Sequence, residues 1–583
     1  MPGIISIALS KYLIEPALFG KIHRRRFPWN LGYVPSRVLS VLILAYIALN
    51  AVLCAINYPA ISPDIWYFSS NKQRISFAAD RLGILSFANI SLAIMFSGRN
   101  TPLLWITGRS RTEILTFHRW VARVAAIQGV AHAALYWTNT DSYGYHVFTL
   151  SAGIHAVNFN NNYWSYGIIA VIALVAMISV LSILPVRVAW YELFLVAHII
   201  AAIVILFCLW EHVALRYHKY YGYEAWLYIA FATWGFDRVV RPLRILLLNW
   251  KSWFSRNHPS AVVELLPGGE FVKVTVFPSI LWHFNAGQHC FLYFPTTTKN
   301  PFQSHPFSIA SWNEGTNLTP QPPQEAASLT SLADSTILQG LSKSRAGPDS
   351  GSRPENTIEL RTLEATSHQI PNTEPSTPNK PSISFIIRPG QGLTRGIHNR
   401  LVKGSKATMS AVFIEGPYGS TDTASLQKAD TIVAIAGGIG MTSILGYLNL
   451  YLTSLCTVSP RDEIAAPRKN GRASRFVLFW SAREESLITA IISQLDNADE
   501  LRRKGVELNI VCTGEVNDGQ SAERLDISEV IIRELGNEHN TGKNVCVVSC
   551  GPGGMADVVR AAVVRSIGKN GVKVELIEDA FAW

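Results

Sequence analysis

This 583-residue chain is poor in charge and in cysteine. Only 16% of its residues are charged while 49% are hydrophobic, and residues 1–250 hold most of the apolar excess. The seven cysteines include no C-x-x-C pair, which argues against a zinc site or an iron–sulfur cluster. Their odd number and scatter fit a reducing compartment for the second half of the chain. The first 20 residues lack a clear small-residue cleavage site, so they do not predict a signal peptide.

Long apolar windows account for the charge-poor half. Windows of roughly 20 residues, the length that crosses a hydrocarbon core, lie near 36–57, 78–97, 114–137, 163–184, 189–211 and 224–247. They predict a polytopic α-helical membrane bundle with six core spans. A shorter apolar stretch over 4–20 contains Lys11, Glu15 and Pro16. It could be a seventh span, an interfacial helix or part of a targeting region.

The basic excess of this chain, a net charge of +10, follows the membrane topology. Basic residues gather at 21–37, at 99–111, around Arg187 and after 237. These connections fall on one side of the membrane if six spans alternate, and the positive-inside rule makes that side cytosolic. We therefore expect a multi-pass membrane protein that does not bind nucleic acid. Residues 1–35 form its N-terminal segment, 36–250 its membrane domain, and the remainder a cytosolic module.

Four histidines lie in two of the apolar windows, as two pairs with the same spacing of 14 residues: His118 with His132, and His198 with His212. Fourteen residues is just under four helical turns and about 21 Å of rise. Both members of a pair therefore share a helix face and lie near opposite sides of the bilayer. Because the two windows run in parallel, they would bring His118 opposite His198 and His132 opposite His212. Each couple matches the two axial ligands of a haem iron, and ionisable groups at membrane depth are usually functional.

Two arginines, Arg81 and Arg123, also fall within the apolar windows. Haem carboxylates need cationic partners, so these side chains could bind them. Reaching along the helix to the membrane interface explains either arginine equally well.

From about residue 259 the sequence changes to short apolar runs separated by Gly and Pro. The runs cover 261–266, 271–277, 290–294, 384–388 and 409–414. Short strands at this spacing predict a small antiparallel β-barrel, which we place at 257–425. A stretch over 313–381, rich in Ser, Thr, Pro and Gln, interrupts the series. Its composition buries too little apolar surface to fold, and we interpret it as a disordered insertion.

After residue 430 buried strand-like runs alternate with helices, which indicates a doubly wound α/β domain over 430–583. The runs cover 431–436, 476–480, 506–511 and 545–549. The first leads into Gly437-Gly438-Ile439-Gly440, at the carboxyl end of a strand, where such sheets bind ligands. Backbone N–H groups at the start of the next helix can receive a pyrophosphate there. Cys550-Gly551-Pro552 ends another strand of the same sheet, so the two loops together predict a dinucleotide site.

These motifs resemble the ferric reductase and NADPH oxidase superfamily, and within it the fungal ferric/cupric reductases. The matching segments are His118-Arg119-Trp120 with His132, His198 with His212, His305-Pro306-Phe307-Ser308-Ile309-Ala310-Ser311, Glu415-Gly416-Pro417-Tyr418-Gly419, Gly437-Gly438-Ile439-Gly440-Met441-Thr442-Ser443, Cys550-Gly551-Pro552 and Phe581-Ala582-Trp583. They occur in the family's order and cover most of the chain. The resemblance implies a ferredoxin-NADP-reductase-like cytosolic module, in which the barrel binds FAD and the α/β domain binds NADPH.

The resemblance also implies roles for individual residues in the FAD site. The flavin motif would comprise His305, Pro306, Phe307, Ser308 and Ser311, with Ser308 against the isoalloxazine ring. Arg388 and Thr394 resemble the family's second flavin-phosphate element, although an arginine at a strand end is often only solvated.

In the NADPH site the resemblance assigns the dinucleotide to two loops: Gly437, Gly438, Gly440 and Thr442 in one, and Cys550, Gly551 and Pro552 in the other. Arg483 follows a strand where relatives recognise the adenosine ribose, and a guanidinium binds a 2′-phosphate in bidentate fashion, which favours NADPH over NADH. Phe581 or Trp583 resembles the terminal aromatic residue that shields the flavin until the nicotinamide displaces it.

The activity that the resemblance implies is a transmembrane electron transfer. NADPH would reduce FAD, the flavin would pass on single electrons, and two b-type haems would carry them outward, the first on His118 and His198 and the second on His132 and His212. Bis-histidine ligation leaves no open iron position, so no residue is assigned a catalytic role and the acceptor is reduced without binding the iron. We expect an NADPH-dependent metalloreductase whose acceptors are extracytosolic Fe(III) or Cu(II) chelates.

Other electron acceptors could be reduced by the same chain of cofactors. Superoxide production from O2, and donation to a partner protein or a pathway metabolite, are the alternatives. The chain has no D-x-[DN]-x-[DN]-G loop, which argues against a calcium-gated oxidase, whereas Met441-Thr442-Ser443 and the insertion favour a metalloreductase. A transporter with metal-binding histidines would leave the flavin and nicotinamide motifs unexplained. The plasma membrane is the expected location, with a vacuolar or other internal membrane as the alternative, and coupling to a metal transporter and the oligomeric state stay open.

Overall fold

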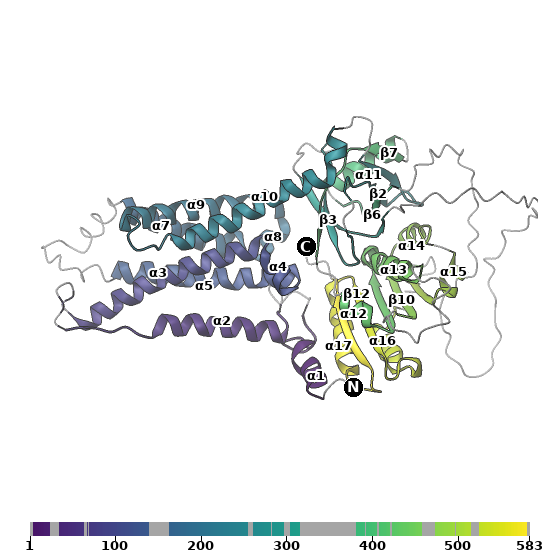
Figure 1. Ribbon diagram of the computed structural model, residues 1–583, viewed down its shortest axis with the longest axis horizontal. Coiled ribbons are helices and arrows are strands. Elements are labelled where there is room, and N and C mark those ends of the chain that lie inside the picture. The colour runs from purple at the N-terminus through teal and green to yellow at the C-terminus, as the bar shows by residue number, and fades with distance from the viewer. Residues whose placement is uncertain are drawn as a thin grey trace, which may run out of the picture.

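The computed structural model describes residues 4–23, 34–62, 64, 67, 69–138, 162–254, 260–280, 283–295, 303–314, 380–390, 392–404, 407–419, 423–456, 473–495, 497–514 and 524–579. These residues form a helical bundle, an antiparallel barrel and a parallel α/β unit, in that order along the chain. The bundle extends to one side of the other two units (Figure 1). Most of the predicted disordered insertion, over 315–379, lies outside the described residues.

The bundle has a long helix at each of the six predicted windows. These are α2 (Arg37–Ala55), α3 (Ser70–Ser97), α5 (Arg111–Thr138), α7 (Asn162–Ala176) continued by η4 (Met177–Leu181), α9 (Tyr191–Tyr217) and α10 (Ala225–Phe254). The short helices α4 (Pro102–Thr107) and α8 (Leu184–Ala189) lie between them. Within the described part of the chain, four segments are long and apolar enough to cross a membrane: Arg37–Ala55, Ser70–Ser97, Asn162–Val180 and Leu193–Tyr217. That α5 and α10 also cross stays a prediction, since both carry more charged side chains.

Buried amides join three helices of the bundle. Asn89 of α3 donates to Oδ1 of Asn50 on α2 and to Oε1 of Gln128 on α5, both at 2.7 Å. The Tyr46 hydroxyl donates to Asn89 Oδ1 at 2.6 Å, and Gln128 donates to Asn50 Oδ1 at 3.1 Å. Polar groups in hydrocarbon find no water as an alternative partner, so a satisfied network fixes the positions of α2, α3 and α5 relative to each other.

The middle unit is an antiparallel barrel of two sheets, with strand orders β5-β6-β2-β1-β7 and β4-β3-β8. Its elements are β1 (Ala261–Leu265), β2 (Val272–Val276), β3 (His289–Tyr293), β4 (Ser304–Ser308), β5 (Ser311–Asn313), β6 (Ser382–Ile387), α11 (Leu393–Lys403), β7 (Ala407–Ser410) and β8 (Phe413–Tyr418). The strands form because side chains alternate about the sheet. In β2, Val272, Val274 and Val276 are buried in the core while the residues between them are not.

The prediction of one continuous strand over 409–414 is wrong. β7 ends at Ser410, and β8 begins at Phe413. Ser410 pairs with Ala261 in the first sheet, whereas Phe413 pairs with Tyr293 in the second. The apolar run therefore contains a crossing between two sheets, which a period of two along the sequence does not reveal.

The last unit is a parallel sheet of order β11-β10-β9-β12-β13. Its elements are α12 (Thr423–Lys428), β9 (Thr431–Gly437), η5 (Gly438–Gly440), α13 (Met441–Cys456), β10 (Arg475–Ala482), α14 (Glu485–Ile492), α15 (Ala498–Arg503), β11 (Val506–Cys512), α16 (Ile527–Gly536), η6 (Glu538–Asn540), β12 (Asn544–Cys550), α17 (Gly553–Ser566) and β13 (Lys573–Glu578). The sequence analysis did not predict β13. β10 and β11 lie on one side of β9, and β12 and β13 on the other. The winding reverses between β9 and β12, which is where doubly wound sheets bind their ligands.

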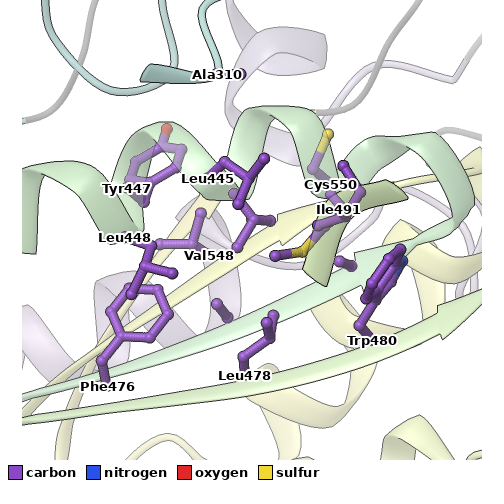
Figure 2. Close-up of a cluster of buried hydrophobic side chains, with 14 of the residues drawn as sticks. Ala310, Leu445, Tyr447, Leu448, Phe476, Leu478, Trp480, Ile491, Val548 and Cys550 are labelled. Carbon is purple, nitrogen blue, oxygen red and sulfur yellow. The ribbon is translucent and has the colours of Figure 1, made fainter. Parts of the chain in front are cut away.

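Apolar side chains cover both faces of this sheet. On one face Leu478, Trp480 and Val548 pack with Leu445 and Leu448 of α13 (Figure 2). The same cluster includes Ala286 and Ala310 from the barrel, so the barrel and the α/β unit share one apolar core. The other face packs against α16 and α17.

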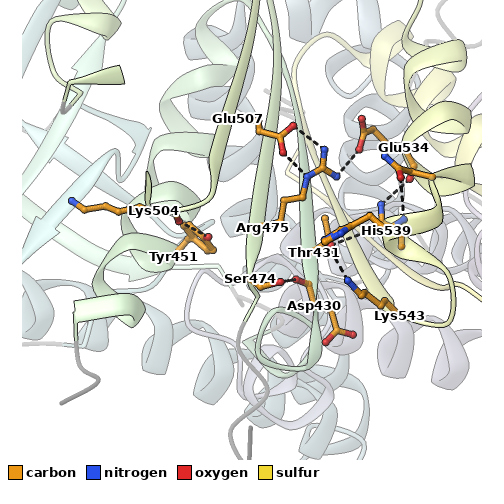
Figure 3. A network of polar contacts seen from close by, with 12 residues as sticks. Asp430, Thr431, Tyr451, Ser474, Arg475, Lys504, Glu507, Glu534, His539 and Lys543 are labelled. Carbon is orange, nitrogen blue, oxygen red and sulfur yellow. Dashed lines mark hydrogen bonds and ion pairs between the residues drawn. The ribbon is translucent and has the colours of Figure 1, made fainter. Parts of the chain in front are cut away.

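Polar contacts tie the amino ends of the strands together (Figure 3). Arg475, the first residue of β10, donates to both carboxylate oxygens of Glu507, at 2.6 and 2.8 Å, and to Glu534 at 2.9 Å. The hydrogen bond to Glu507 raises the pKa of Arg475, and the same bond lowers the pKa of Glu507. The loops described below lie at the opposite edge of the sheet, at the carboxyl ends of the strands.

The N-terminal helices α1 (Ile4–Leu9) and η1 (Ser10–Ile14) lie near α17 of the α/β unit, at the N label of Figure 1. Arg560 of α17 donates to the backbone oxygen of Glu15 at 2.6 Å and to the Glu578 carboxylate at 2.7 Å. The backbone N–H of His23 donates to Asp557 of the same helix at 3.0 Å. Residues 4–23 therefore form a strap across the α/β unit. These residues form two short helices, of six and five residues, against the α/β unit; whether the segment is a seventh span, an interfacial helix or part of a targeting region stays open.

The strap also contacts the start of the first long helix. Arg37 donates to the backbone oxygens of Ala17 and Tyr12, at 3.0 and 2.8 Å. Ala17 is buried. The strap therefore connects α2 to α17.

We expect Arg560→Ala to destabilise the α/β unit. The change leaves the Glu578 carboxylate, whose side chain is 4% exposed, without its cationic partner. Removing one member of a buried pair costs about 3–5 kcal/mol. Thermal unfolding followed by tryptophan fluorescence measures the loss, with Arg565→Ala on the same helix as the control, because Arg565 is exposed and donates to the Ala561 carbonyl of its own helix. Equal shifts in Tm for the two variants would contradict the prediction.

Candidate functional site

The structure brings the predicted histidines together in the predicted couples, across α5 and α9. The ring centroids of His118 and His198 are 6.3 Å apart, and those of His132 and His212 are also 6.3 Å apart. An imidazole nitrogen lies about 1.1 Å from its ring centre and binds a metal at about 2 Å, so a metal ion between two such nitrogens places the centroids about 6.2 Å apart. The spacing of both couples therefore fits an ion that binds one histidine on each side.

Hydrogen bonds orient these rings. Three histidines have Nδ1 next to a backbone carbonyl of a neighbouring helix: His118 with Ala93 at 2.8 Å, His132 with Ala79 at 2.7 Å, and His212 with Tyr163 at 2.7 Å. A carbonyl only accepts, so Nδ1 carries the proton and Nε2 keeps a lone pair for a metal. The fourth ring, that of His198, has Nδ1 3.4 Å from the Ser182 hydroxyl. Metal-binding histidines are held in this way in other proteins.

The couple of His132 and His212 borders a pocket whose empty volume, with the open solvent at its mouth included, is about 810 Å³. Its walls are mostly apolar: Phe87, Ile90, Leu174, Ile205, Leu209 and Val213. Two glycines make room for the rings, because a Cβ on Gly83 would lie 2.8 Å from Nδ1 of His132, and a Cβ on Gly167 would lie 2.8 Å from Nδ1 of His212. A pocket of this size with few polar groups suits a cofactor. The residues present thus fit a haem.

Arg81 and Arg123, which the sequence analysis considered as partners of the haem carboxylates, have other contacts. Arg81 donates to the backbone oxygens of Leu53, Ile56 and Asn57, at 3.3, 2.6 and 3.3 Å. These carbonyls end α2, so Arg81 caps that helix and is not available as a haem clamp. The guanidinium of Arg123 lies over the Trp120 ring, 4.9 Å from its centroid.

Sequence reasoning missed a carboxylate in the pocket wall. Asp80 of α3 lines the pocket together with Tyr217 and Tyr223, and the Tyr136 hydroxyl donates to its Oδ1. The ring of Tyr136 packs edge-on against His132, with centroids 5.0 Å apart. An acidic residue inside an apolar window is a signal that could have identified Asp80 from the sequence.

The predicted flavin motif runs along β4 into β5. Ser308 is buried and pairs with His289 of β3, while Phe307 pairs with Cys290 and Pro306 with Phe291. His305 Nε2 lies 3.2 Å from the Gln303 amide nitrogen, which can donate to it. Ser311 opens β5 and pairs with Ser384 of β6. The motif thus crosses from one sheet of the barrel to the other.

The second predicted flavin element contacts the α/β unit. Arg388 follows β6 and pairs with Glu484, the residue after Arg483. Thr394 accepts a hydrogen bond from the Gly390 N–H at 2.9 Å, which closes the turn before α11. Arg388 is therefore more than a solvated strand-end arginine, since it bridges two units.

The two dinucleotide loops touch each other where the winding of the sheet reverses. A Cβ on Gly440 would lie 2.7 Å from the Cys550 carbonyl carbon, and one on Gly437 would lie 2.8 Å from Cδ of Pro552. Gly551 packs against the same loop, since its Cβ would lie 3.1 Å from Cα of Gly437. These glycines are required by the packing of one loop on the other. A side chain at Gly440 would displace the Cys550 loop before it reached any ligand.

The end of the chain returns to the same place. The Cys550 thiol donates to the backbone oxygen of Asp579 at 2.9 Å, and the Ser443 hydroxyl donates to the Asp579 carboxylate. Burial, followed by the charge of Asp579, raises the pKa of Cys550 well above its ordinary value, so the thiol stays protonated as a donor. Residues 580–583, which include the predicted aromatics Phe581 and Trp583, lie outside the described residues.

The remaining nucleotide residues lie on the same edge of the sheet. Arg483 is exposed directly after β10, and Ser481 of that strand pairs with Gly437 of β9. Arg483 therefore follows the strand that lies next to the glycine loop. Thr442 is buried, and its hydroxyl donates to the Ile439 carbonyl at 3.0 Å, within the loop.

His289, beside the flavin motif, is a further residue that the sequence analysis missed. Its ring lies 6.1 Å from that of Tyr418 on β8, measured between centroids. Burial, with smaller contributions from Arg111 and Arg99, lowers the pKa of His289 to about 3. The imidazole next to Ser308 is therefore neutral at physiological pH.

Comparison with known proteins agrees with this arrangement. Three family models match in order: the ferric reductase like transmembrane component at 82–209, an FAD-binding domain at 255–320, and the ferric reductase NAD binding domain at 429–530. They confirm the resemblance to ferric reductases, and they confirm that FAD-binding and NAD-binding domains follow a membrane component.

Individual relatives match most of the chain. Ferric reductase transmembrane component 4 of Saccharomyces cerevisiae is 26% identical over 98% of this chain and 72% of its own length. Component 3 of the same yeast is 27% identical over 77% of this chain and 51% of its own length. Ferric/cupric reductase transmembrane component 1 of Candida albicans is 26% identical over 53% of this chain and 38% of its own length. The chain thus spans about half or less of the second and third of these relatives.

Acidification should destabilise the barrel through His289. In the folded protein the His289 imidazole takes up a proton only at about pH 3, whereas in the unfolded chain it does so near pH 6.5. The contribution of His289 to stability is therefore complete above about pH 6.5 and is lost as the pH falls toward 3. His289→Gln, which cannot take up a proton, should flatten the dependence of Tm on pH between about 6.5 and 4.

The matched control is His398→Gln, in the same barrel, where the ring bonds the Gly269 carbonyl at 2.8 Å. Parallel curves of Tm against pH for the wild type and His289→Gln would show that His289 does not titrate in this way.

Proposed function

Since this chain carries a ferric reductase-like transmembrane component, an FAD-binding domain and a NAD-binding domain in this order, we propose that it is a transmembrane metalloreductase. It takes electrons from cytosolic NADPH and delivers them across the membrane to Fe(III) or Cu(II) chelates. The observation that carries the proposal is the presence of two histidine couples. In each couple the ring centroids are 6.3 Å apart, and the two couples are separated by 14 residues on each helix.

Two b-type haems are the groups that these couples would hold, one on His118 and His198 and one on His132 and His212. When bound, such a haem accepts and donates single electrons. The protein holds the four rings in place by the hydrogen bonds to Nδ1, and Gly83 leaves space for one of them. Histidines would hold each haem from both sides, so the metal chelate would be reduced without binding the iron.

The proposed membrane topology rests on the basic connection at 99–111. Arg99, in that connection, pairs with Glu415 of the barrel at 3.0 Å. This contact supports placing the basic connections, the barrel and the α/β unit on one side of the membrane, the cytosolic side. We assign residues 36–250 to the haem domain, 257–425 to the FAD domain and 430–583 to the NADPH domain.

FAD is assigned to the flavin motif of the barrel, next to the α/β unit. Ser308, buried beside the neutral His289, would face the isoalloxazine ring. Arg388 would meet the flavin diphosphate, for which its pairing with Glu484 has to open. Thr394 would contribute through the turn that it closes.

NADPH is assigned to the point where the winding of the sheet reverses. The loops of Gly437–Gly440 and Cys550–Pro552 would present backbone N–H groups to the pyrophosphate. Asp579 is held at this point by Cys550 and Ser443. Phe581 or Trp583, both outside the described residues, would be the terminal aromatic residue that shields the flavin.

Sealed vesicles with the cytosolic side outward test the function. NADPH added outside should reduce ferric chelate trapped inside, with the same rate in the absence of oxygen and in the presence of superoxide dismutase. His132→Ala should keep FAD and one haem of two, keep NADPH-driven reduction of a dye that accepts electrons from the flavin, and lose reduction of the trapped chelate.

His218→Asn is the control, because His218 ends α9 in the left-handed conformation (φ 48°) that Asn tolerates and is outside both couples. Two haems in His132→Ala would show that the couples are wrongly assigned. Loss of chelate reduction on removal of oxygen would instead identify superoxide as the product.

The choice of NADPH depends on Arg483. Arg483→Ala should raise the KM for NADPH by about tenfold, the loss of one charge-assisted contact of roughly 1.5 kcal/mol, and leave the KM for NADH nearly unchanged, since NADH lacks the 2′-phosphate. Steady-state kinetics with both cofactors measure this, with Arg503→Ala, an exposed arginine of α15, as the control. Equal effects of Arg483→Ala on both cofactors would make Arg483 an ordinary surface residue.

A further inference from the structure

Three side chains from α10 and the connection after α3 converge on one short segment of the barrel, at β8. Arg99, just after α3, places Nη1 3.0 Å from Oε2 of Glu415. Arg244 of α10 donates to the Pro417 carbonyl at 3.1 Å. Asn249 of α10 donates to the Ile414 carbonyl at 2.9 Å and accepts from its N–H at 3.1 Å. All three partners belong to Ile414–Pro417, which overlaps the segment Glu415–Gly419 that resembles the family's motif.

Glu415 is fully buried and both of its carboxylate oxygens are used. Its side chain is 0% exposed. The Tyr293 hydroxyl donates to Oε2, and the Tyr418 hydroxyl to Oε1, both at 2.5 Å. The guanidinium of Arg99 is stacked on the Phe291 ring, 3.5 Å from its centroid. A buried charge is tolerated only when it is paired and hydrogen-bonded, so these contacts allow Glu415 and Arg99 little freedom to move.

This ion pair lies between the two proposed cofactor sites. On the barrel side, β8 pairs with β3, and β3 pairs with β4, where Ser308 of the flavin motif lies opposite His289. On the bundle side, Arg99 follows α3, and Ala93 of α3 holds the ring of His118 through its carbonyl at 2.8 Å. A rigid path of two strands and one helix end therefore joins the flavin motif to the first histidine couple.

We propose that the Arg99–Glu415 pair positions the flavin for single-electron transfer to the first haem. Both are positioning residues, because neither is placed on the reacting atoms, and the inference rests on the proposed function. The physical reason is the sensitivity of such a step to geometry: the rate of electron transfer falls steeply as the distance between donor and acceptor grows, so a displacement of β8 relative to α3 slows it. An ion pair contributes little net stability compared with apolar packing but fixes one arrangement of its two partners.

Stopped-flow absorbance of the purified, cofactor-loaded protein under anaerobic conditions separates the two steps. Mixing with NADPH bleaches the flavin first, and the haem bands change afterwards. In Glu415→Gln, which removes the charge, and in Arg99→Lys, which keeps the charge but loses the planar fork, flavin content, haem content and the rate of flavin reduction should stay within about twofold of the wild type. The rate of haem reduction should fall by at least about tenfold.

Two further variants sharpen the test. In the double variant Arg99→Lys with Glu415→Gln, haem reduction should be no slower than in the slower single variant, because both changes break one interaction. Glu534→Gln is the matched control. It removes the carboxylate of another largely buried pair, with Arg475 at 2.9 Å, at the far edge of the α/β unit (Figure 3), and should leave haem reduction unchanged.

Three results would overturn the proposal. Haem reduction at the wild-type rate in both single variants would show that the pair has no positioning role. Equal slowing of flavin and haem reduction, or loss of flavin from both variants, would show that Glu415 only supports the barrel. Single effects that multiply in the double variant would show that the residues act independently. Failure of the proposed function gives a different result, since the wild type itself would show no NADPH-driven haem reduction.

Discussion

The distance between α5 and α9 is the constraint on which the rest of the molecule depends. Two histidine couples with equal ring separations of 6.3 Å require the two helices to run parallel over the whole stretch between them. Carbonyls of α3 and α7 hold three of the rings by Nδ1. The helices α3 and α7 therefore fix the orientation of the histidine rings. The buried amides fix α2 relative to α3 and α5.

The parts of the structure that the sequence predicted are those governed by local rules. The spacing of His118 and His132 follows from the helical repeat, and the glycines after β9 follow from the chemistry of a strand end. The crossing between β7 and β8, the strap, and the pairing of Arg99 with Glu415 could not be predicted. Each depends on residues that are distant in sequence, and no periodicity encodes which of them meet.

Motif residues in this chain serve the fold as well as the ligand. Gly437 and Gly440 match a dinucleotide loop, yet the observed atoms that exclude a Cβ are those of Cys550, Gly551 and Pro552. Glu415 similarly matches a family segment, while its carboxylate binds Arg99 of the bundle and two tyrosines. Loss of activity after substitution of a motif residue is therefore ambiguous unless cofactor content is measured with it.

The strap over residues 4–23 gives the α/β unit a second attachment. The peptide chain already reaches this unit through α10 and the barrel, and the strap adds a route from α2 to α17 through Arg37, Glu15 and Arg560. The α/β unit also shares an apolar core with the barrel, so it is restrained on two sides, by the barrel and by the strap. A movement of the α/β unit away from the barrel would therefore have to break the hydrogen bonds of Arg560 with the strap or carry the strap along with α17.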